Sequence, residues 1–448
     1  MENLGWQAFS ETLALLVMNV LLIGSGGREH AIAWKISQSS LLSTLYVAPG
    51  NAGTNSIAKN IDLNPLDFPA IGRFIRKNEI NMLIVGPEVP LVEGIVNYFN
   101  ESDKFESLVT IGPCKAGAML EGSKDFSKEF MARYNIPTAA YATFSSKEVK
   151  KAKAYLDERT PPYVIKADGL AAGKGVIITS NKTKAEDTLD DILVRNRFGN
   201  AGARVVIEQF MEGEEVSYFV VTDGDAYRIL PSAKDYKRVG EGDKGLNTGG
   251  MGAVSPVPFV DEEFHTKTVN QIIIPTIKGL KEDGIPYNGF IFIGLMKVGS
   301  DPYVVEYNCR LGDPETEVIL PRIKSDLLHM FDSLGSGMLS EYDLQIDERA
   351  VSTVILTSGG YPESYEKGLN IMGLENKPDE NEGLILHAGT KAMRGKVITN
   401  GGRVIACTGF GTTLKRALER SYKLTEAIDF DNKQFRKDIG QDVLPNEE

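Results

Sequence analysis

The chain has few cysteines, and their spacing fits neither a disulfide framework nor a zinc site. Its three cysteines, Cys114, Cys309 and Cys407, are odd in number, far apart and outside any CxxC pair. Domains stapled by disulfides, and zinc sites built on paired cysteines, have the opposite pattern. We therefore expect a protein of a reducing compartment, the cytoplasm, in which each cysteine is a small buried apolar residue.

An excess of basic residues is also lacking. The chain has 49 Lys and Arg against 61 Asp and Glu, which gives a net charge of -12. Nucleic acids and anionic membranes attract clustered Lys and Arg. We expect neither as a partner, although single basic side chains can still bind phosphates.

A hydrophobic run long enough to span a bilayer is missing as well. The apolar segment near the N-terminus is interrupted by Asn19 and ended by the glycines from Gly24, and no Lys or Arg precedes it. This excludes both a secretory signal and a membrane span. Residues 1–17 are expected to be an extension ahead of the first domain, translated from an upstream start codon.

The remaining composition is that of a globular protein. Hydrophobic residues make up 42% and charged residues 25% of the chain. A chain of 448 residues is too long for a single hydrophobic core, so roughly three domains are expected.

The stretch from Pro302 to Glu317, PYVVEYNCRLGDPETE, carries the strongest chemical pattern. Side chains two apart on a strand share a face, so Glu306 and Asn308 should project together as oxygen ligands for Mg²⁺. Arg310 follows, a planar cation that can grip a carboxylate or phosphate, and then a turn at Gly312 to Pro314. Taken alone, EYN also fits an ordinary strand that ends in a polar turn.

A glycine-rich turn follows the first strand, Asn19 to Ile23, and opens a helix with the sequence GSGGREHA. Backbone amides at such a helix start bind anions, and Arg28 adds a charge. The dinucleotide fingerprint fails, because Glu29 replaces its third glycine and the next strand, 44–47, supplies no acidic residue. A monophosphate fits better than NAD, and a purely structural turn is the alternative. His30 is expected to pack within the helix.

Alternating strands and helices continue, with strands at Met82 to Val85 and Leu108 to Ile111. This alternation predicts an open parallel sheet with sites at the carboxyl ends of its strands. Glu88 stands at one such end and could bind a sugar hydroxyl, or could be a solvated loop carboxylate. A polar helix is expected from Glu121 to Arg133, with Lys124 near its start.

A second glycine-rich loop, ADGLAAGKGV, follows a strand from Tyr163 to Lys166. It is not a Walker loop, because three residues separate Gly169 from Gly173 and Gly175 replaces the metal-binding Ser or Thr. We interpret it as a flexible phosphate cover between two strands, with Lys166 and Lys174 facing the triphosphate. A charged hairpin without a ligand is the alternative.

The next segments complete the middle of the chain. A strand from Arg204 to Glu208 leads into an exposed segment that could present backbone groups to a purine, and Glu215 could bind ribose hydroxyls. The Gly- and Asp-rich stretch 232–256 is predicted to be a long functional loop without regular structure. A helix over 264–282 and a strand over 289–298 should follow.

The last part of the chain resembles a small mixed domain. After Pro321 we expect a helix at 326–339, strands at 350–358, 384–388 and 404–409, and a closing helix at 412–428. His387 lies in one of these strands and is expected to be structural.

Six motifs in this order resemble those of the glycinamide ribonucleotide synthetase family of ATP-grasp ligases, from about Met18 to the C-terminal helix: GSGGREHA, GPEVPLVEG, LEGSKDFSKEFM, IKADGLAAGKGV, the KDYKR to NTGGMGA loop and EYNCRLGDPETE. The chain departs from the family in its N-terminal extension and in Glu317, where glutamine is more usual. The resemblance implies an α/β protein with the ATP-grasp fold. Its parts would be an open parallel-sheet domain at 18–118, an ATP-grasp domain at 119–325 with a lid at 137–206, and a small mixed α/β domain at 340–443.

The resemblance also implies a reaction, the ATP-dependent joining of glycine to 5-phosphoribosylamine through a glycyl phosphate. Mg²⁺, with Mn²⁺ as an alternative, would be held by Glu306 and Asn308, and the catalytic residues would be Asp235 and Arg310. The remaining roles are ATP binding by Lys124, Lys166, Gly173, Lys174, Glu208, Phe210 and Glu215, and substrate binding by Gly26, Gly27, Arg28, Asn51, Glu88 and Lys237. The 163–179 hairpin would be the lid that excludes water, and no obligate protein partner is expected.

Three other functions remain open at this point. Another carboxylate-amine ligase or a carboxylase could use the same ATP apparatus. An NAD dehydrogenase is disfavoured by the failed fingerprint, and a nucleotide-binding regulator would not need a metal pair and a second phosphate site. Only measured turnover separates the regulator from an enzyme.

Overall fold

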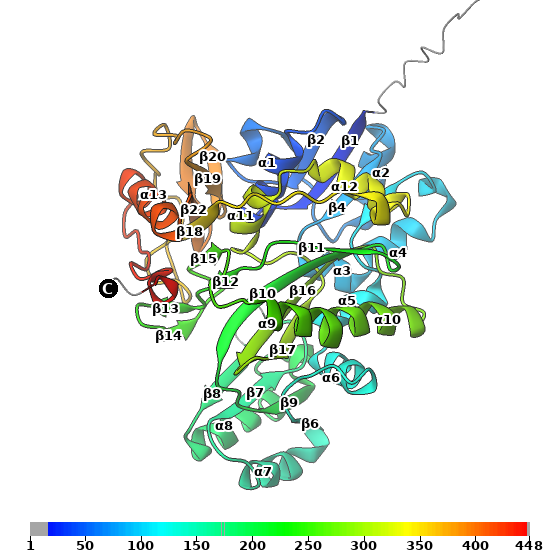
Figure 1. Ribbon diagram of the computed structural model, residues 1–448, viewed down its shortest axis with the longest axis vertical. Coiled ribbons are helices and arrows are strands. Elements are labelled where there is room, and N and C mark those ends of the chain that lie inside the picture. The colour runs from blue at the N-terminus through cyan, green and yellow to red at the C-terminus, as the bar shows by residue number, and fades with distance from the viewer. Residues whose placement is uncertain (1–16, 172, 174, 446–448) are drawn as a thin grey trace, which may run out of the picture.

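The computed structural model describes residues 17–171, 173 and 175–445. The predicted N-terminal extension therefore lies outside the described residues except for Val17, and so does Lys174. No helix in the described ranges has the length and apolar content needed to cross a membrane. Figure 1 shows the N-terminal sheet at the top, the C-terminal region at the left and a separate lobe at the bottom.

An open parallel sheet forms the N-terminal part. Its strand order is β3-β2-β1-β4-β5, and each neighbouring pair is parallel. Nearly every residue of β1 is buried, as expected for a parallel strand that is covered on both faces. The predicted open parallel sheet is confirmed. Its strands are β1 (Met18–Gly24), β2 (Leu42–Pro49), β3 (Lys59–Asn60), β4 (Met82–Val85) and β5 (Val109–Ile111), and its helices are α1 (Gly27–Ile36), α2 (Phe68–Lys77), α3 (Glu88–Glu93), α4 (Ile95–Asn100) and α5 (Lys115–Gly122).

The bottom lobe in Figure 1 is a four-stranded antiparallel sheet in the order β6-β9-β7-β8. Its helices α7 and α8 pack on it through a hydrophobic cluster of its own, which includes Leu156, Ile165 and Leu189. The lobe therefore has a hydrophobic core of its own. Its elements are β6 (Tyr141–Ser145), α7 (Val149–Asp157), β7 (Tyr163–Ala167), β8 (Val176–Thr179), α8 (Lys182–Leu193) and β9 (Arg204–Gln209).

A second antiparallel sheet, β11-β10-β16-β17, lies at the centre. The helix predicted over 264–282 covers it, but it contains a π-helical turn at Val269–Ile273 just before Pro275. Proline has no N–H to continue the regular pattern, which explains the wider turn. The elements of this part are α6 (Lys124–Arg133), β10 (Glu214–Thr222), β11 (Tyr227–Ile229), α9 (Glu262–Thr268), α10 (Ile274–Glu282), β16 (Gly289–Val298) and β17 (Asp301–Asn308).

The C-terminal sheet has the order β12-β15-β18-β22-β19. Its strands β12 and β15 come from a part of the chain that lies far before the other three. β12 (Lys234–Asp235) and β15 (Gly252–Ser255) come from the stretch that was predicted to lack regular structure, and β15 pairs with β18 in antiparallel register. That prediction was wrong. The other elements are β13 (Arg238–Gly240), β14 (Lys244–Asn247), α11 (Thr316–Ile319), α12 (Leu327–Gly335), β18 (Ala350–Thr357), β19 (Gly383–His387), β20 (Thr390–Met393), β21 (Lys396–Thr399), β22 (Arg403–Gly411) and α13 (Leu414–Ala427).

Two predicted helices have different limits in the structure. The helix expected over 121–133 is split, because Ser123 is extended and its side chain accepts a hydrogen bond from the amide of Phe126, which begins α6. The helix expected over 326–339 ends at Gly335, and Gly337 after it has a positive φ of 69°.

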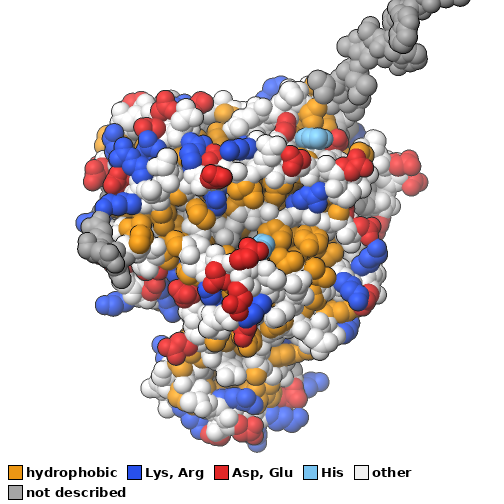
Figure 2. Space-filling view, in the orientation of Figure 1, with side chains coloured by type: hydrophobic (Ala, Val, Ile, Leu, Met, Phe, Trp, Pro, Cys, Tyr) orange, Lys and Arg blue, Asp and Glu red, His pale blue; other side chains and the backbone are white. Residues whose placement is uncertain are grey.

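One hydrophobic cluster joins the N-terminal, central and C-terminal sheets. It contains Val20 of β1, Phe290 of β16, Phe331 of α12 and Val351 of β18. Figure 2 shows acidic and basic side chains interspersed over the visible face, with hydrophobic side chains gathered in a band across its middle.

Candidate functional site

The predicted metal ligands lie at the end of β17, next to an irregularity in the sheet. Leu295 pairs with Val304 but Gly294 pairs with Glu306, so Val305 is bulged out of the ladder. Beyond the bulge, Glu306 and Asn308 are two apart on one strand and share a face. The Nδ2 atom of Asn308 is buried without a hydrogen-bond partner.

This donor pair fits a magnesium ion. The described residues contain no group of three or more His, Cys, Asp or Glu that could hold a metal by themselves. Mg²⁺ does not need one, because it is bound through one or two protein oxygens and takes its other ligands from water and phosphates. Glu306 and Asn308 would hold it here.

Two buried lysines lie close to the carboxylate of Glu208, and one of them contacts the bulge in β17. Lys166 Nζ donates to the carbonyl of Val305 at 3.2 Å and lies 2.8 Å from Oε2 of Glu208, while Lys128 Nζ lies 3.2 Å from Oε1 of the same carboxylate. All three side chains are buried. Burial lowers the pKa of Lys128 to about 8 although Glu208 opposes the shift. The Glu208 carboxylate therefore pairs with both Lys128 and Lys166. Phe210, two residues later, is 39% exposed.

The start of α6 joins this lysine group to the glycine-rich hairpin β7–β8. The Asp168 carboxylate accepts from Ser123 Oγ and from the amide of Asp125, both at 2.9 Å. Lys124 Nζ lies 3.4 Å from the carbonyls of Asp168 and Gly169, and burial lowers its pKa. The hairpin predicted as a lid is thus attached at the start of α6, with Gly173 at its turn.

Asp235, a predicted catalytic residue, and Lys237, a predicted substrate-binding residue, line a small pocket next to the Val305 bulge, which in this conformation is too small for a water molecule. Lys237 Nζ lies 2.7 Å from Oε2 of Glu215. Burial disfavours its charge, but the carboxylates of Asp235 and Glu215 raise the pKa of Lys237 well above its usual value. Burial raises the pKa of Asp235. The pocket is lined by Glu215, Val216, Ser217, Asp235, Lys237, Gly294, Leu295 and Val305.

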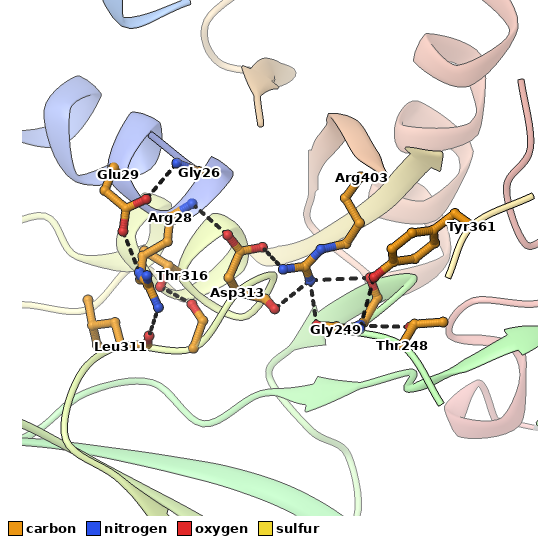
Figure 3. A network of polar contacts seen from close by, with 12 residues as sticks. Gly26, Arg28, Glu29, Thr248, Gly249, Leu311, Asp313, Thr316, Tyr361 and Arg403 are labelled. Atoms are coloured by element: carbon orange, nitrogen blue, oxygen red, sulfur yellow. Dashed lines mark hydrogen bonds and ion pairs between the residues drawn. The ribbon is translucent and has the colours of Figure 1, made fainter. Parts of the chain in front are cut away.

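The predicted monophosphate site at the start of α1 is more enclosed than expected. The amide of Gly26 donates to Glu29 Oε2 at 2.6 Å, and the amide of Arg28 donates to Asp313 Oδ2 at 3.2 Å. The Arg28 guanidinium points inward, where it binds Glu29 Oε1 at 2.6 Å and the carbonyl of Leu311 at 3.1 Å (Figure 3). A substrate would therefore meet the backbone here before it met the Arg28 side chain.

A cavity of about 320 Å³ opens beside this helix start. Asn51 lies in its wall, where its Nδ2 donates to the carbonyls of Ser25 at 2.9 Å and His387 at 2.7 Å. Gly27 faces the buried carboxylate of Glu317, with no room for a side chain. The wall consists of Ser25, Gly26, Gly50, Asn51, Asp313, Ala388, Gly389, Thr390, Asn400, Gly401 and Arg403.

Glu88 and Arg310 contact each other. Arg310 Nε lies 3.3 Å from Glu88 Oε2, and its Nη2 lies 2.6 Å from Oε1 of Glu121. Burial opposes ionisation of Glu88, but Arg310 and Arg28 lower its pKa below the usual value. Arg310 is thus fixed by two carboxylates.

Several side chains of the site were missed from the sequence. Glu121 of α5 and Lys128 of α6 both fall within the predicted helix 121–133, which was interpreted only as polar, although LEGSKDFSKEFM was among the motifs that carried the resemblance. Asp313 was noted only as a turn residue, and Arg403 comes from the C-terminal strand β22, in the part that was predicted only as a small mixed domain. His387, expected to be structural, contacts His30, whose Nδ1 accepts from the His387 amide at 2.7 Å.

Comparison with known protein families accounts for almost the whole chain. The models that match describe the N domain, the ATP-grasp domain and the C domain of phosphoribosylglycinamide synthetase, at residues 18–121, 122–316 and 351–442. The chain belongs to the phosphoribosylglycinamide synthetase family. Glycinamide ribonucleotide is another name for phosphoribosylglycinamide, so the family that the motifs resemble is confirmed.

Individual relatives of the synthetase family agree with this. A phosphoribosylamine-glycine ligase of Haemophilus influenzae is 46% identical over 433 residues, which cover 96% of this chain and 99% of the relative. One from Salmonella typhimurium is 47% identical over 436 residues, covering 96% and 100%.

Solved structures confirm the fold of the synthetase family. The crystal structure of phosphoribosylamine-glycine ligase from Thermotoga maritima has a TM-score of 0.80 at 34% identity, covering 94% of this chain and 99% of that one. A Campylobacter jejuni biotin carboxylase has a TM-score of 0.71 at 14% identity, covering 94% and 93%. The second likeness shows the ATP-grasp fold alone. The family membership also excludes the dehydrogenase alternative.

Proposed function

We propose that this chain joins glycine to 5-phosphoribosylamine with ATP and releases glycinamide ribonucleotide, ADP and phosphate, a step of purine biosynthesis. The observation that carries the proposal is the end-to-end match, at 46% identity, to ligases of that name. The geometry supports it, because a group of lysines lies beside the end of β17 and a cavity opens beside the start of α1.

ATP would bind between the β7–β8 hairpin and the central sheet. Lys124 and Lys166 would contact the phosphates, with Gly173 and Lys174 in the covering loop. The segment from Glu208 to Phe210 would lie at adenine through its backbone, and Glu215 would bind the ribose while it keeps its pairing with Lys237. Mg²⁺ at Glu306 and Asn308, with Mn²⁺ as an alternative, would neutralise charge on the phosphates.

Two steps make up the chemistry. A carboxylate oxygen of glycine attacks the γ-phosphorus of ATP, the bond to ADP breaks, and glycyl phosphate forms. The amine of phosphoribosylamine then attacks the carbonyl carbon, phosphate leaves with the bridging oxygen, and one N–H proton is released. Lys237 and Asp235 would orient glycine, and Arg310 would stabilise the transferring phosphate or the acyl group.

The amino sugar would occupy the 320 Å³ cavity. Gly26 and Gly27 would lie at its phosphate, next to the Arg28 amide that donates to Asp313, and Asn51 would fix the position of the wall through its hydrogen bonds to the carbonyls of Ser25 and His387. Glu88 would bind a hydroxyl at the Arg310 side. We also propose that the enzyme is cytoplasmic and needs no obligate protein partner. The proposed domains are the open parallel-sheet domain at 18–118, the ATP-grasp domain at 119–325 with its lid at 137–206, and the C-terminal domain at 340–443.

The fate of the carboxylate oxygens tests this function. Glycine labelled with ¹⁸O in its carboxylate, incubated with ATP, Mg²⁺ and freshly generated phosphoribosylamine, should transfer one labelled oxygen to phosphate and keep the other in the product amide. Mass spectrometry of phosphate checks this. Unlabelled phosphate beside newly formed product would contradict the glycyl phosphate, and no product at all would contradict the function.

A further inference from the structure

Arg403 of strand β22 in the C-terminal sheet contacts two separate segments of the site, the turn after β17 and a glycine-rich loop. Its Nη2 lies 3.0 Å from Asp313 Oδ1, and its Nη1 donates to the carbonyl of Asp313 at 2.6 Å. The same Nη1 donates to the carbonyl of Gly249 and lies 3.4 Å from that of Gly250 (Figure 3). One planar cation therefore joins the turn after β17 to the glycine-rich loop 247–252.

The first partner, Asp313, belongs to the amino-sugar cavity. Its carboxylate is shared, because Oδ1 faces Arg403 and Oδ2 accepts from the amide of Arg28 at the start of α1. Burial opposes its charge, but Arg403 and Arg28 hold its pKa below the usual range. Arg403 therefore fixes both the orientation and the charge of a carboxylate in the cavity wall.

The second partner, the loop 247–252, is hydrogen-bonded to the backbone of Lys237, which lines the pocket that we assign to glycine. Thr248 donates to the carbonyl of Lys237 from both its amide and its Oγ1, each at 2.8 Å. The Tyr361 hydroxyl accepts from the amide of Gly249 at 3.0 Å. A side chain on Gly249 would collide with the Arg403 guanidinium, so the contact is close. Displacing this loop would move the backbone of Lys237.

We propose that Arg403 is a positioning residue that couples the two substrate sites, by holding Asp313 at the amino-sugar cavity and the loop 247–252 behind Lys237 at the glycine pocket. The identity of the two substrates rests on the proposed function. The C-terminal domain then takes part in assembling the site, through a side chain that binds Asp313 and the carbonyls of Gly249 and Gly250.

Three variants separate this role from a merely structural one. Arg403→Lys keeps the charge but cannot span both partners, so the KM for glycine and the KM for phosphoribosylamine should each rise about fivefold or more, with the KM for ATP within about twofold. Tyr361→Phe frees only the loop, so the KM for glycine alone should rise. Arg420 is the control, because it also binds a carbonyl, that of Phe410, and a carboxylate, that of Glu382, away from the cavity. Arg420→Lys should leave all three constants within about twofold of wild type.

Chemical rescue gives a second readout. Guanidinium added at millimolar concentration should restore part of the turnover lost in Arg403→Ala and none in Glu306→Ala. A rise in only one substrate KM for Arg403→Lys, equal changes in Arg420→Lys, or an unchanged glycine KM in Tyr361→Phe would overturn the coupling. If wild type accepts a different carboxylate or amine, the same comparison made with that pair still tests Arg403, and only the substrate assignment fails.

Discussion

Glu306 offers the carboxylate oxygens of the predicted metal pair, and its carboxylate acts on two lysines of the site. The negative charge of this carboxylate favours the protonated form of both Lys124 and Lys237. Glu306 itself is half-buried at the end of β17, so removing it should leave the fold intact.

We predict that Glu306→Ala lowers kcat by about 100-fold or more, because a ligand that stabilises charge on the transferring phosphate is lost. Initial rates and a thermal melt check this together, and the melting temperature should not change. Asp301→Ala, at the exposed start of the same strand, is the control, since Asp301 pairs only with Lys267 among the described residues. Wild-type turnover in Glu306→Ala would remove the metal assignment.

At single residues, the sequence predicted the type of chemistry better than the direction of a side chain. Arg28 was correctly found beside a glycine-rich helix start, but its guanidinium binds Glu29 and the carbonyl of Leu311, far away in the sequence. Likewise, Glu215 and Lys237 were given separate substrates, and the fold pairs them. Partners separated by many residues are set by the tertiary structure, which a local pattern does not contain.

Among the secondary-structure elements, those stabilised by their own composition were predicted well. β4 was predicted with its observed limits, and β1 and β7 to within one residue at each end, because each is a short run of β-branched and apolar residues. β12 and β15 were missed. They are short, rich in Gly and polar residues, and β15 pairs with β18, about 100 residues later.

The contact of α1 with β19 through His30 and His387 makes a prediction about pH. Burial first, and then the charge of His387, lowers the pKa of His30 to about 3 from its usual 6.5. Between about pH 3 and pH 6.5 the His30 side chain is protonated in the unfolded chain but not in the folded one. Its contribution to the free energy of unfolding is therefore fully present above about pH 6.5 and is lost as the pH falls.

We therefore predict that acidification to about pH 5 costs the wild type about 2 kcal/mol more than it costs His30→Gln. Glutamine can still accept the hydrogen bond from the His387 amide but does not titrate. Urea unfolding at about pH 7.5 and about pH 5 gives the comparison. Parallel losses in the two proteins would show that His30 does not remain neutral in the fold.

For the whole molecule, the order of the motifs predicted the ATP-grasp fold, and the comparisons confirm it. The sequence did not predict how the parts interlock. The segment after β17 contacts both the N-terminal and the C-terminal parts, since Arg310 binds Glu88 and Glu121, and Asp313 binds Arg28 and Arg403. A site assembled at such a junction requires every domain to be in place, so its geometry appears only in the folded chain.

The most direct measurement is ADP release from ATP and Mg²⁺ by the full chain, with glycine and freshly generated phosphoribosylamine supplied singly and together. The ligase account predicts ADP only when both are present, with one glycinamide ribonucleotide formed for each ADP. ADP formed at the same rate without the amine, or only with another carboxylate and amine, would contradict it.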